Sequence, residues 1–211
     1  MSTYATDSQL PHRDLIPLVV PPVTLEGRAV RLEPLRLEHA AALASVCEEP
    51  VFEFLSVVLR TQADVEAYIS AALEAASRGT EQPFFIRDRE TGAPLGTTRY
   101  MTISRNDRNL EIGHTWLGRR AWRTRVNTEC KFLLLRHAFE QLHVMRVQLK
   151  TDRRNARSRA AIERIGAKFE GILRNHMLVR GGVVRDSAYY SILDTEWPEV
   201  KERLEERLTR E

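Results

Sequence analysis

"LEIGHTWLGRRAWRTRVNTECKFLLLRHAF", residues 110–139, joins an alternating segment, an arginine-rich loop and a helical pattern. The alternation over residues 109–118 predicts a strand. The apolar residues that follow recur at helical spacing, at Phe132, Leu135, Phe139 and Leu142. Asn127 or Thr128 is the expected N-cap of this helix. Between strand and helix, four arginines occupy seven positions. Such a loop either binds a polyanion or is an ordinary solvated loop.

Composition restricts the class of protein. With 211 residues, 43% of them hydrophobic and 29% charged, the chain is long enough for one globular domain with a substantial core. The formal charge of +3 is a mild basic excess. Because dedicated nucleic-acid binders usually carry denser positive charge, a modest anionic ligand is favoured over nucleic acid.

Cysteine usage and hydropathy indicate the compartment. Cys47 and Cys130 are the only cysteines, and they lack the paired spacing of a disulfide framework or a zinc site. We therefore expect no metal and a cytoplasmic protein. No run of about 18 apolar residues is present, and charges interrupt the start of the chain where a signal peptide would be apolar. We expect neither secretion by that route nor a membrane span.

The order of predicted elements indicates the fold class. Residues 1–24 are proline-containing and are expected to form an extended arm, followed by a single domain over residues 25–211 with a C-terminal helix at 196–209. The predicted strands cover 28–35, 82–90, 94–103, 109–118, 145–152, 168–179 and 183–193; the predicted helices cover 37–49, 61–79, 128–142, 155–166 and 196–209. Thr61, with Asp64 three residues on, is the expected N-cap of the helix at 61–79. Gly181 and Gly182 predict a hairpin turn between the last two strands, because glycine accepts positive φ. This order predicts an α+β sheet with helices on its faces, because a doubly wound fold would alternate strictly.

Several motifs occur in this order: "LEIGHTWL", "WRTRVNTECKFLLLRHAF", "RVQLKTDRRNARSRAAIERIGAKFEGILR" and "RDSAYYSILDTEW". Together they resemble the GNAT N-acetyltransferase superfamily, and within it the branch of RimJ/RimL-type ribosomal-protein N-terminal acetyltransferases. The resemblance covers roughly residues 25–198. It implies the GNAT acyl-CoA N-acyltransferase fold, a mixed and mostly antiparallel sheet of about seven strands with helices on both faces. It also implies acetyl-CoA as donor, a primary amine as acceptor, and direct transfer between them.

The arginine loop departs from the family pattern. The family has Arg/Gln-x-x-Gly-x-Gly/Ala before the central helix, and alignment sets Arg120 at the first position but Arg123 and Arg125 where the glycines belong. Arginines here remain compatible with a pyrophosphate at residues 123–128, because a helix start favours anions and arginine binds phosphate. The resemblance implies these cofactor-binding residues: Trp116, Leu117, Arg120, Arg123, Thr124, Arg125, Val126, Asn127, Thr128, Asn155 and Ser158. Asn155 is expected both to cap the helix at 155–166 and to bind the pantetheine arm.

Transfer to an amine requires a neutral amine, so a base is expected. Glu111 is the predicted base, and the alternative is a surface glutamate at a strand start. Simple alternation puts two sets of residues on opposite faces: Leu110, Ile112, His114 and Trp116 on one, and Glu111, Gly113, Thr115 and Leu117 on the other. His114 is therefore predicted to be a packed core histidine, and it remains the second candidate base.

The proton donor for the thiolate is less defined. The family often uses a tyrosine where this chain has Ile162. Ser158 is the predicted acid by resemblance to the RimL-like branch. Its alternative role is to help Asn155 cap the helix, and solvent could also supply the proton.

The acceptor stays open at this level. The resemblance favours a protein N-terminal α-amine, and the alternatives are a small-molecule amine, a non-catalytic acyl-CoA-binding protein and an RNA- or ribosome-binding module. The acidic residues Glu48, Glu49 and Glu53 could attract a cationic amine, and a solvated loop explains them equally well. A homodimer through the proline-containing arm or the last helix is a further alternative.

Overall fold

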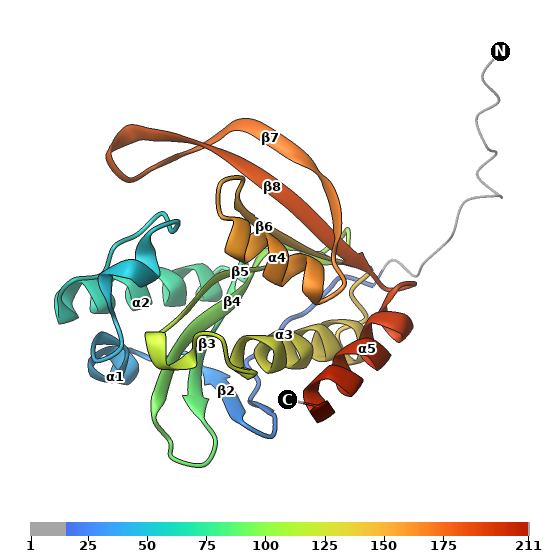
Figure 1. Ribbon diagram of the computed structural model, residues 1–211, viewed down its shortest axis with the longest axis horizontal. Helices are drawn as coiled ribbons and strands as arrows, with labels where there is room; N and C mark the ends of the chain where they lie inside the picture. The colour runs from blue at the N-terminus through green and yellow to red at the C-terminus, as the bar shows by residue number, and fades with distance from the viewer. Residues whose placement is uncertain (1–15, 211) are drawn as a thin grey trace.

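The computed structural model describes residues 16–210. Within them a mixed eight-stranded sheet has the order β1-β2-β3-β4-β5-β6-β8-β7, and only β5 and β6 are parallel neighbours (Figure 1). The strands are β1 (Leu25–Glu26), β2 (Val30–Pro34), β3 (Gln82–Asp88), β4 (Pro94–Ser104), β5 (Asn109–Leu117), β6 (Arg146–Asp152), β7 (Lys168–Val179) and β8 (Val183–Leu193). The helices are α1 (Ala40–Ala44), α2 (Gln62–Ser77), α3 (Val126–Arg136), α4 (Ala156–Arg164) and α5 (Trp197–Arg210).

The predicted class is correct, and the strand count is eight where about seven were expected. The additional strand is β1, whose two residues pair with β2. They are too few to produce a recognisable alternation. Of the predicted arm, residues 1–15 lie outside the described part of the chain. Leu18 is buried in the core, and its N–H donates to the Arg105 carbonyl at 2.8 Å.

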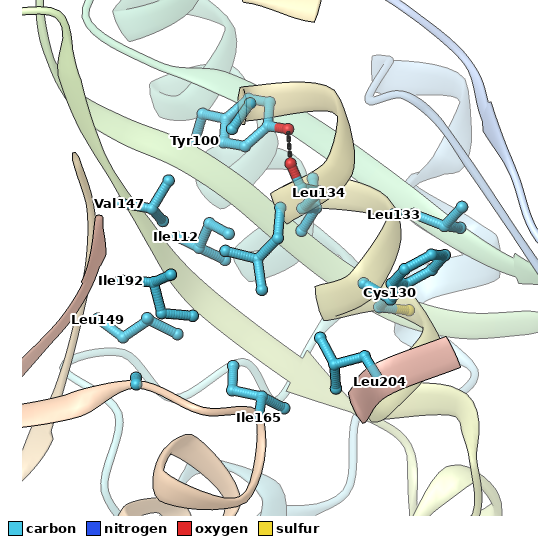
Figure 2. Packing of buried hydrophobic residues seen from close by; sticks show 14 of the residues in the cluster. Tyr100, Ile112, Cys130, Leu133, Leu134, Val147, Leu149, Ile165, Ile192 and Leu204 are labelled. Carbon is cyan, nitrogen blue, oxygen red and sulfur yellow. Dashed lines mark hydrogen bonds between the residues drawn. The ribbon is translucent and has the colours of Figure 1, made fainter. Parts of the chain in front are cut away.

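Helices cover both faces of the sheet with separate apolar clusters. On one face α3 and α5 pack against residues such as Tyr100, Val147 and Ile192 (Figure 2). There the Tyr100 hydroxyl donates to the Leu134 carbonyl at 2.6 Å, which fixes α3 to β4. On the other face α1 and α2 pack against Phe85 and other apolar residues of the sheet. No helix within residues 16–210 is both long and apolar enough to span a membrane.

Two helix starts test the capping predictions. Thr61 caps α2 as predicted, since its Oγ1 accepts from the Asp64 N–H at 3.1 Å in a reciprocal capping box. The predicted cap of the central helix at Asn127 or Thr128 is wrong. α3 follows Arg125, and the first helical N–H, that of Val126, is taken up by the Thr124 hydroxyl at 3.3 Å. Asn127 and Thr128 therefore lie inside the first turn.

The predicted helix over 37–49 is shorter in the structure. A 3₁₀ turn at Leu37–His39 leads into α1, which ends at Ala44. Glu48 is extended, with φ −121° and ψ 138°, and a separate 3₁₀ turn follows at Glu49–Phe52, with Pro50 as its second residue. Proline lacks the N–H that a continuing helix would require there. Pro50 thus prevents the helix from resuming, and the segment after α1 instead forms one wall of the cleft described below.

The hairpin of β7 and β8 extends over the α2 side of the molecule (Figure 1). At its tip, over Arg180–Gly182, the Arg180 guanidinium donates to the backbone carbonyl of Glu53. Gly181 adopts φ 68° and Gly182 φ 82°, the positive values for which this glycine pair was predicted to form the turn. The last hairpin and the segment after α1 are thus joined.

Glu129 connects α3 to the first hairpin of the sheet. Glu129 is 3% exposed, and its carboxylate accepts hydrogen bonds from the backbone N–H groups of Arg28 and Ala29, the latter at 2.9 Å. Gly27 lies against the same side chain, so closely that a Cβ there would be 3.0 Å from Glu129 Cγ. Hydrogen bonds therefore attach α3 both to β4, through Tyr100, and to the turn between β1 and β2, through Glu129.

Replacing Glu129 with alanine should reduce the free energy of unfolding by about 2 kcal/mol or more, because two partly buried N–H groups lose their acceptor. Urea denaturation measures the change. The exposed Glu202 on α5 provides the control, and its alanine variant should stay within about 0.5 kcal/mol of the parent. Equal stabilities of the two variants would contradict this role of Glu129.

Candidate active site

A cleft of about 1580 Å³ opens where β5 and β6 separate. These strands pair in parallel over only three positions, Asn109↔Arg146 to Glu111↔Gln148. Beyond Glu111, the edge of β5 that faces β6 pairs with no strand within the described residues. The cleft is lined by both strands, the arginine loop, the start of α3, the side of α4 and the segment after α1.

A β-bulge in β5 changes which side chains face the cleft. The register with β4 shifts between Thr97↔Trp116 and Arg99↔Gly113, so His114 and Thr115 together lie opposite Thr98. His114 adopts φ 46°. Such a bulge reverses the alternation beyond it.

The predicted grouping of His114 and Trp116 with Ile112 is therefore wrong. Leu117 packs in the cluster with α3, as Ile112 does. Trp116 lies in the cluster with α1 and α2, and the His114 ring lies 6.2 Å from that of Tyr68 on α2. Glu111 is opposite Met101 in the ladder and shares the His114 face. The two candidate bases thus lie on the same side of the sheet.

Glu111 is a buried residue of the cleft. It is 1% exposed, and its Oε2 accepts from Gln148 Nε2 at 2.9 Å and from Lys150 Nζ at 3.1 Å. A Cβ at Gly113 would come 2.8 Å from Glu111 Oε1, so the glycine leaves room for the carboxylate. The alternative of a surface glutamate is excluded. The arrangement presents an oriented carboxylate at the point where the strands separate.

His114 is neutral at physiological pH. Burial lowers its pKa from 6.5 to about 4, and the positive charges of Arg99, Lys150 and Arg185 act in the same direction. Its Nδ1 is buried without a hydrogen-bond partner among the described residues. The imidazole can therefore accept a hydrogen bond, but it is a weak base.

The arginine loop is positioned by backbone and aromatic contacts. Trp122 Nε1 donates to the Leu117 carbonyl at 2.8 Å, and the Arg157 guanidinium lies 4.4 Å from the Trp122 ring. Arg123 has φ 60°, the left-handed conformation for which glycine is favoured, and it lines the cleft. Arg125 also lines the cleft, but its guanidinium donates to the Leu208 carbonyl on α5 at 3.2 Å. Arg125 therefore also contacts α5, whereas no hydrogen bond joins the Arg123 side chain to α5 within residues 16–210.

Most of the predicted cofactor residues line one cleft. These are Trp116, Leu117, Arg123, Thr124, Arg125, Asn127, Thr128, Asn155 and Ser158. Arg120 is exposed outside the lining, and Val126, the first residue of α3, is buried in the core. Asn155 caps α4 as predicted, with its Oδ1 accepting from the Ser158 N–H at 2.9 Å. Ile162, at the position of the family tyrosine, also lines the cleft.

Further basic residues of the cleft were missed in the sequence. Arg157 and Arg164 on α4 and Arg207 on α5 line it together with the loop arginines. Arg157 and Arg164 are seven residues apart, which places them on the same side of a helix two turns apart. That spacing was a usable signal, whereas the approach of α5 required the tertiary structure.

Lys131 was also missed. It is 6% exposed, lines the cleft, and donates from Nζ to Thr115 Oγ1 at 2.6 Å, which in turn lies 2.7 Å from Thr98 Oγ1. Burial lowers its pKa from 10.5 to about 8. Its place one turn after Asn127 and Thr128, which also line the cleft, was the signal available in the sequence.

Other conspicuous residues have structural contacts. Tyr190 is buried and bonds to Arg159 and Glu163 on α4, while the Tyr189 hydroxyl lies 3.2 Å from His176 Nε2. Burial raises the pKa of the Cys130 thiol to about 12, so Cys130 is not a thiolate. Residues 16–210 contain no group of three or more His, Cys, Asp and Glu side chains that could hold a metal.

The protein-family model described as "Acetyltransferase (GNAT) domain" matches residues 29–168, more than half of the chain. This protein belongs to the GNAT acetyltransferase family. A GCN5-related N-acetyltransferase from Brucella melitensis is 32% identical, with a TM-score of 0.84 over 90% of this chain and 87% of that one. The GNAT fold and the N-acetyltransferase class expected from the sequence are thereby confirmed. The GNAT fold uses acetyl-CoA.

Two further GNAT relatives carry more specific names. A Bacillus subtilis protein named "Putative ribosomal N-acetyltransferase YdaF" is 33% identical over 106 residues, which are 50% of this chain and 57% of that protein. Mycobacterium smegmatis RimJ, solved in complex with CoA-disulfide, is 24% identical, with a TM-score of 0.74 over 87% of this chain and 93% of that one. At this identity the RimJ comparison establishes a shared fold.

Replacing Lys131 with methionine should stabilise this GNAT domain at pH 7. The folded-state pKa lies below the unfolded value, so burial of the lysine destabilises the fold below pH 8, and this penalty disappears as the pH rises from about 8 to 10.5. The difference between the two pKa values limits the gain in unfolding free energy to ~3 kcal/mol. Loss of the hydrogen bond to Thr115 reduces this gain by about 1 kcal/mol.

Urea denaturation of parent and variant at pH 7 and pH 10.5 measures this difference. The gain at pH 7 should shrink or reverse at pH 10.5. Lys168→Met provides the control, because Lys168 is exposed and paired with Glu196 at 2.7 Å. A gain for Lys131→Met that is the same at both pH values would show that its charge is not the cause.

Proposed function

We propose that this enzyme transfers the acetyl group of acetyl-CoA directly to a primary amine, with Glu111 as the base. The observation that carries the proposal is the buried Glu111 carboxylate, held by Gln148 and Lys150 where β5 and β6 separate. The favoured acceptor class is a protein N-terminal α-amine, as for RimJ/RimL-type enzymes, and the name of the YdaF relative supports it. A small-molecule amine is the alternative.

The cofactor groove is proposed from the basic end of the cleft. Asn127 and Thr128 lie in the first turn of α3, where backbone N–H groups have no helical acceptor, and both line the cleft. Arg123, Arg157 and other arginines surround this helix start. Free N–H groups and guanidinium groups together suit a pyrophosphate. The pantetheine arm would then follow the separated strands past Asn155 toward Glu111.

Glu111 would accept the proton that the amine loses, directly or through a water molecule. An amine is mostly protonated at neutral pH, so its attack on the thioester requires this step. His114 is a poorer candidate because its pKa is lowered to about 4. The thiolate that leaves takes a proton from Ser158 or from solvent, and the low basicity of a thiolate makes this the easier transfer.

Replacing Glu111 with glutamine should lower kcat/KM at pH 7 by about 10²-fold, the lower end of the range for general-base catalysis. The loss should become smaller as the pH approaches the amine pKa, since more acceptor is then already neutral. Steady-state assays of CoA release between pH 6.5 and 9.5 measure this. Glu90→Gln, at an exposed turn, is the control. A pH–rate profile parallel to the parent would remove Glu111 as the base.

Replacing Arg123 with glutamate should weaken CoA binding about tenfold, which corresponds to about 1.4 kcal/mol. Arg123 is chosen over Arg125 because the latter also holds α5 through Leu208. Titration calorimetry with CoA measures the affinity, and Arg105→Glu on an exposed loop is the control.

Arg123→Gly separates two contributions of this position. Glycine suits φ 60° and allows close backbone approach, but it removes the guanidinium. Weaker binding by Arg123→Gly would show that the charge contributes to CoA affinity. Unchanged affinity in both variants would refute the assignment of this loop to the pyrophosphate.

A further inference from the structure

Arg185 on β8 is a buried cation in the cleft that the proposed reaction does not use. It is 8% exposed and lines the cleft. Among the described residues, no carboxylate forms an ion pair with its guanidinium, and its Nε is buried without a hydrogen-bond partner. A buried cation with no bonded partner is costly, so its retention calls for a ligand or a functional reason.

The two carboxylates whose charges act on Arg185 are already paired with other cations. Asp152 and Glu111 attract its charge through space. Asp152, however, is paired with Arg154 at 2.7 Å, and Glu111 is paired with Lys150 at 3.1 Å. The hydrogen-bonding capacity of the Arg185 guanidinium therefore remains available to a molecule in the cleft.

Arg185 belongs to the end of the cleft bounded by the β7–β8 hairpin. It pairs in the ladder with Met177, which also lines the cleft, and the tip of this hairpin contacts Glu53. The proposed pyrophosphate site at the start of α3 lies on different elements. The position of Arg185 therefore suits the acceptor.

The charges at this end are complementary to an amine that carries an anionic group. Glu111 offers a carboxylate for the amine, while Arg185 and Lys150 provide positive charge on the same face. The same positive charges act on His114, whose pKa is lowered first by burial and then by Arg99, Lys150 and Arg185. A guanidinium binds a carboxylate through two parallel hydrogen bonds, which also orients it.

We propose that Arg185 binds a carboxylate of the acceptor, so that the preferred substrates are amines with a carboxylate close to the amino group. This inference rests on the proposed acetyl transfer at Glu111. Two sources share this chemistry: a free amino acid, and a protein N-terminus with an acidic residue at its second position. In both, Arg185 acts as a specificity-determining residue, because it holds the carboxylate and leaves the amine facing Glu111.

Matched acceptor pairs test the proposal with the full-length enzyme and acetyl-CoA. One pair is an amino acid and its amide, and the other is a Ser-Asp and a Ser-Asn tetrapeptide amide. The carboxylate member of at least one pair should have a kcat/KM at least tenfold higher, mainly through KM. The pair that shows the preference identifies the source.

Arg185→Gln should remove this preference by lowering kcat/KM for the carboxylate member alone. Arg153→Gln is the control, since Arg153 lies on the exposed surface and pairs with Asp186 at 3.2 Å. Equal loss for both members of a pair, or no preference in the parent enzyme, would overturn the role of Arg185. The comparison in the parent enzyme needs no variant, so it decides the question even if Arg185→Gln does not fold.

The two proposals fail in different ways. If the enzyme acetylates amines but does not distinguish the members of either pair, acetyl transfer stands and the carboxylate site is wrong. If no amine, with or without a carboxylate, supports acetyl-CoA-dependent release of CoA, the proposed function itself is wrong.

Discussion

The separation of β5 from β6 after three parallel pairs is the constraint on which the rest of the structure depends. A strand that leaves its neighbour exposes N–H and C=O groups, and such groups must find other partners. The bulge at His114 occurs in the same segment and turns Trp116 toward α2 while Leu117 packs beneath α3. The separation opens the cleft with Glu111 at its apex, and the bulge anchors the part of β5 beyond Glu111 in both apolar clusters.

The cleft is also divided electrostatically. At one end arginines from three elements surround the start of α3, and at the other Glu111, Lys150 and Arg185 form a group of mixed charge. Burial keeps two basic side chains of the cleft less protonated than usual, His114 with a pKa of about 4 and Lys131 with a pKa of about 8. An excess of fixed positive charge along the cleft favours anionic ligands and opposes the protonation of nearby amines.

Periodicity and turn chemistry predicted the elements well, because those signals are local. The Thr61 capping box, the Asn155 cap and the Gly181–Gly182 turn all lie where the sequence placed them. The α3 start was misplaced because the Thr124 hydroxyl serves the first turn from outside the helix. Local reasoning therefore fails by a few residues where several polar side chains near a helix start could each act as its cap.

The site was predicted less completely, because its geometry depends on contacts distant in sequence. Glu111 was found from its place on the strand, but its burial depends on Gln148 and Lys150 of β6. The faces of His114 and Trp116 were inverted because strict alternation cannot include a bulge. Arg185 carried no local signal, since an arginine in an alternating strand looks like a solvated residue until the hairpin is folded over the cleft.

The order of strands has a consequence for synthesis of the chain. From β1 to β6 each strand pairs with the one made just before it, whereas β6 obtains its other neighbour, β8, only after α4 and β7 have been made. During translation the edge of β6 therefore stays open while the rest of the sheet can already form. Docking of β8 closes this edge and delivers Arg185 in the same event, so a chain arrested before β8 would expose an aggregation-prone edge and lack one wall of its cleft.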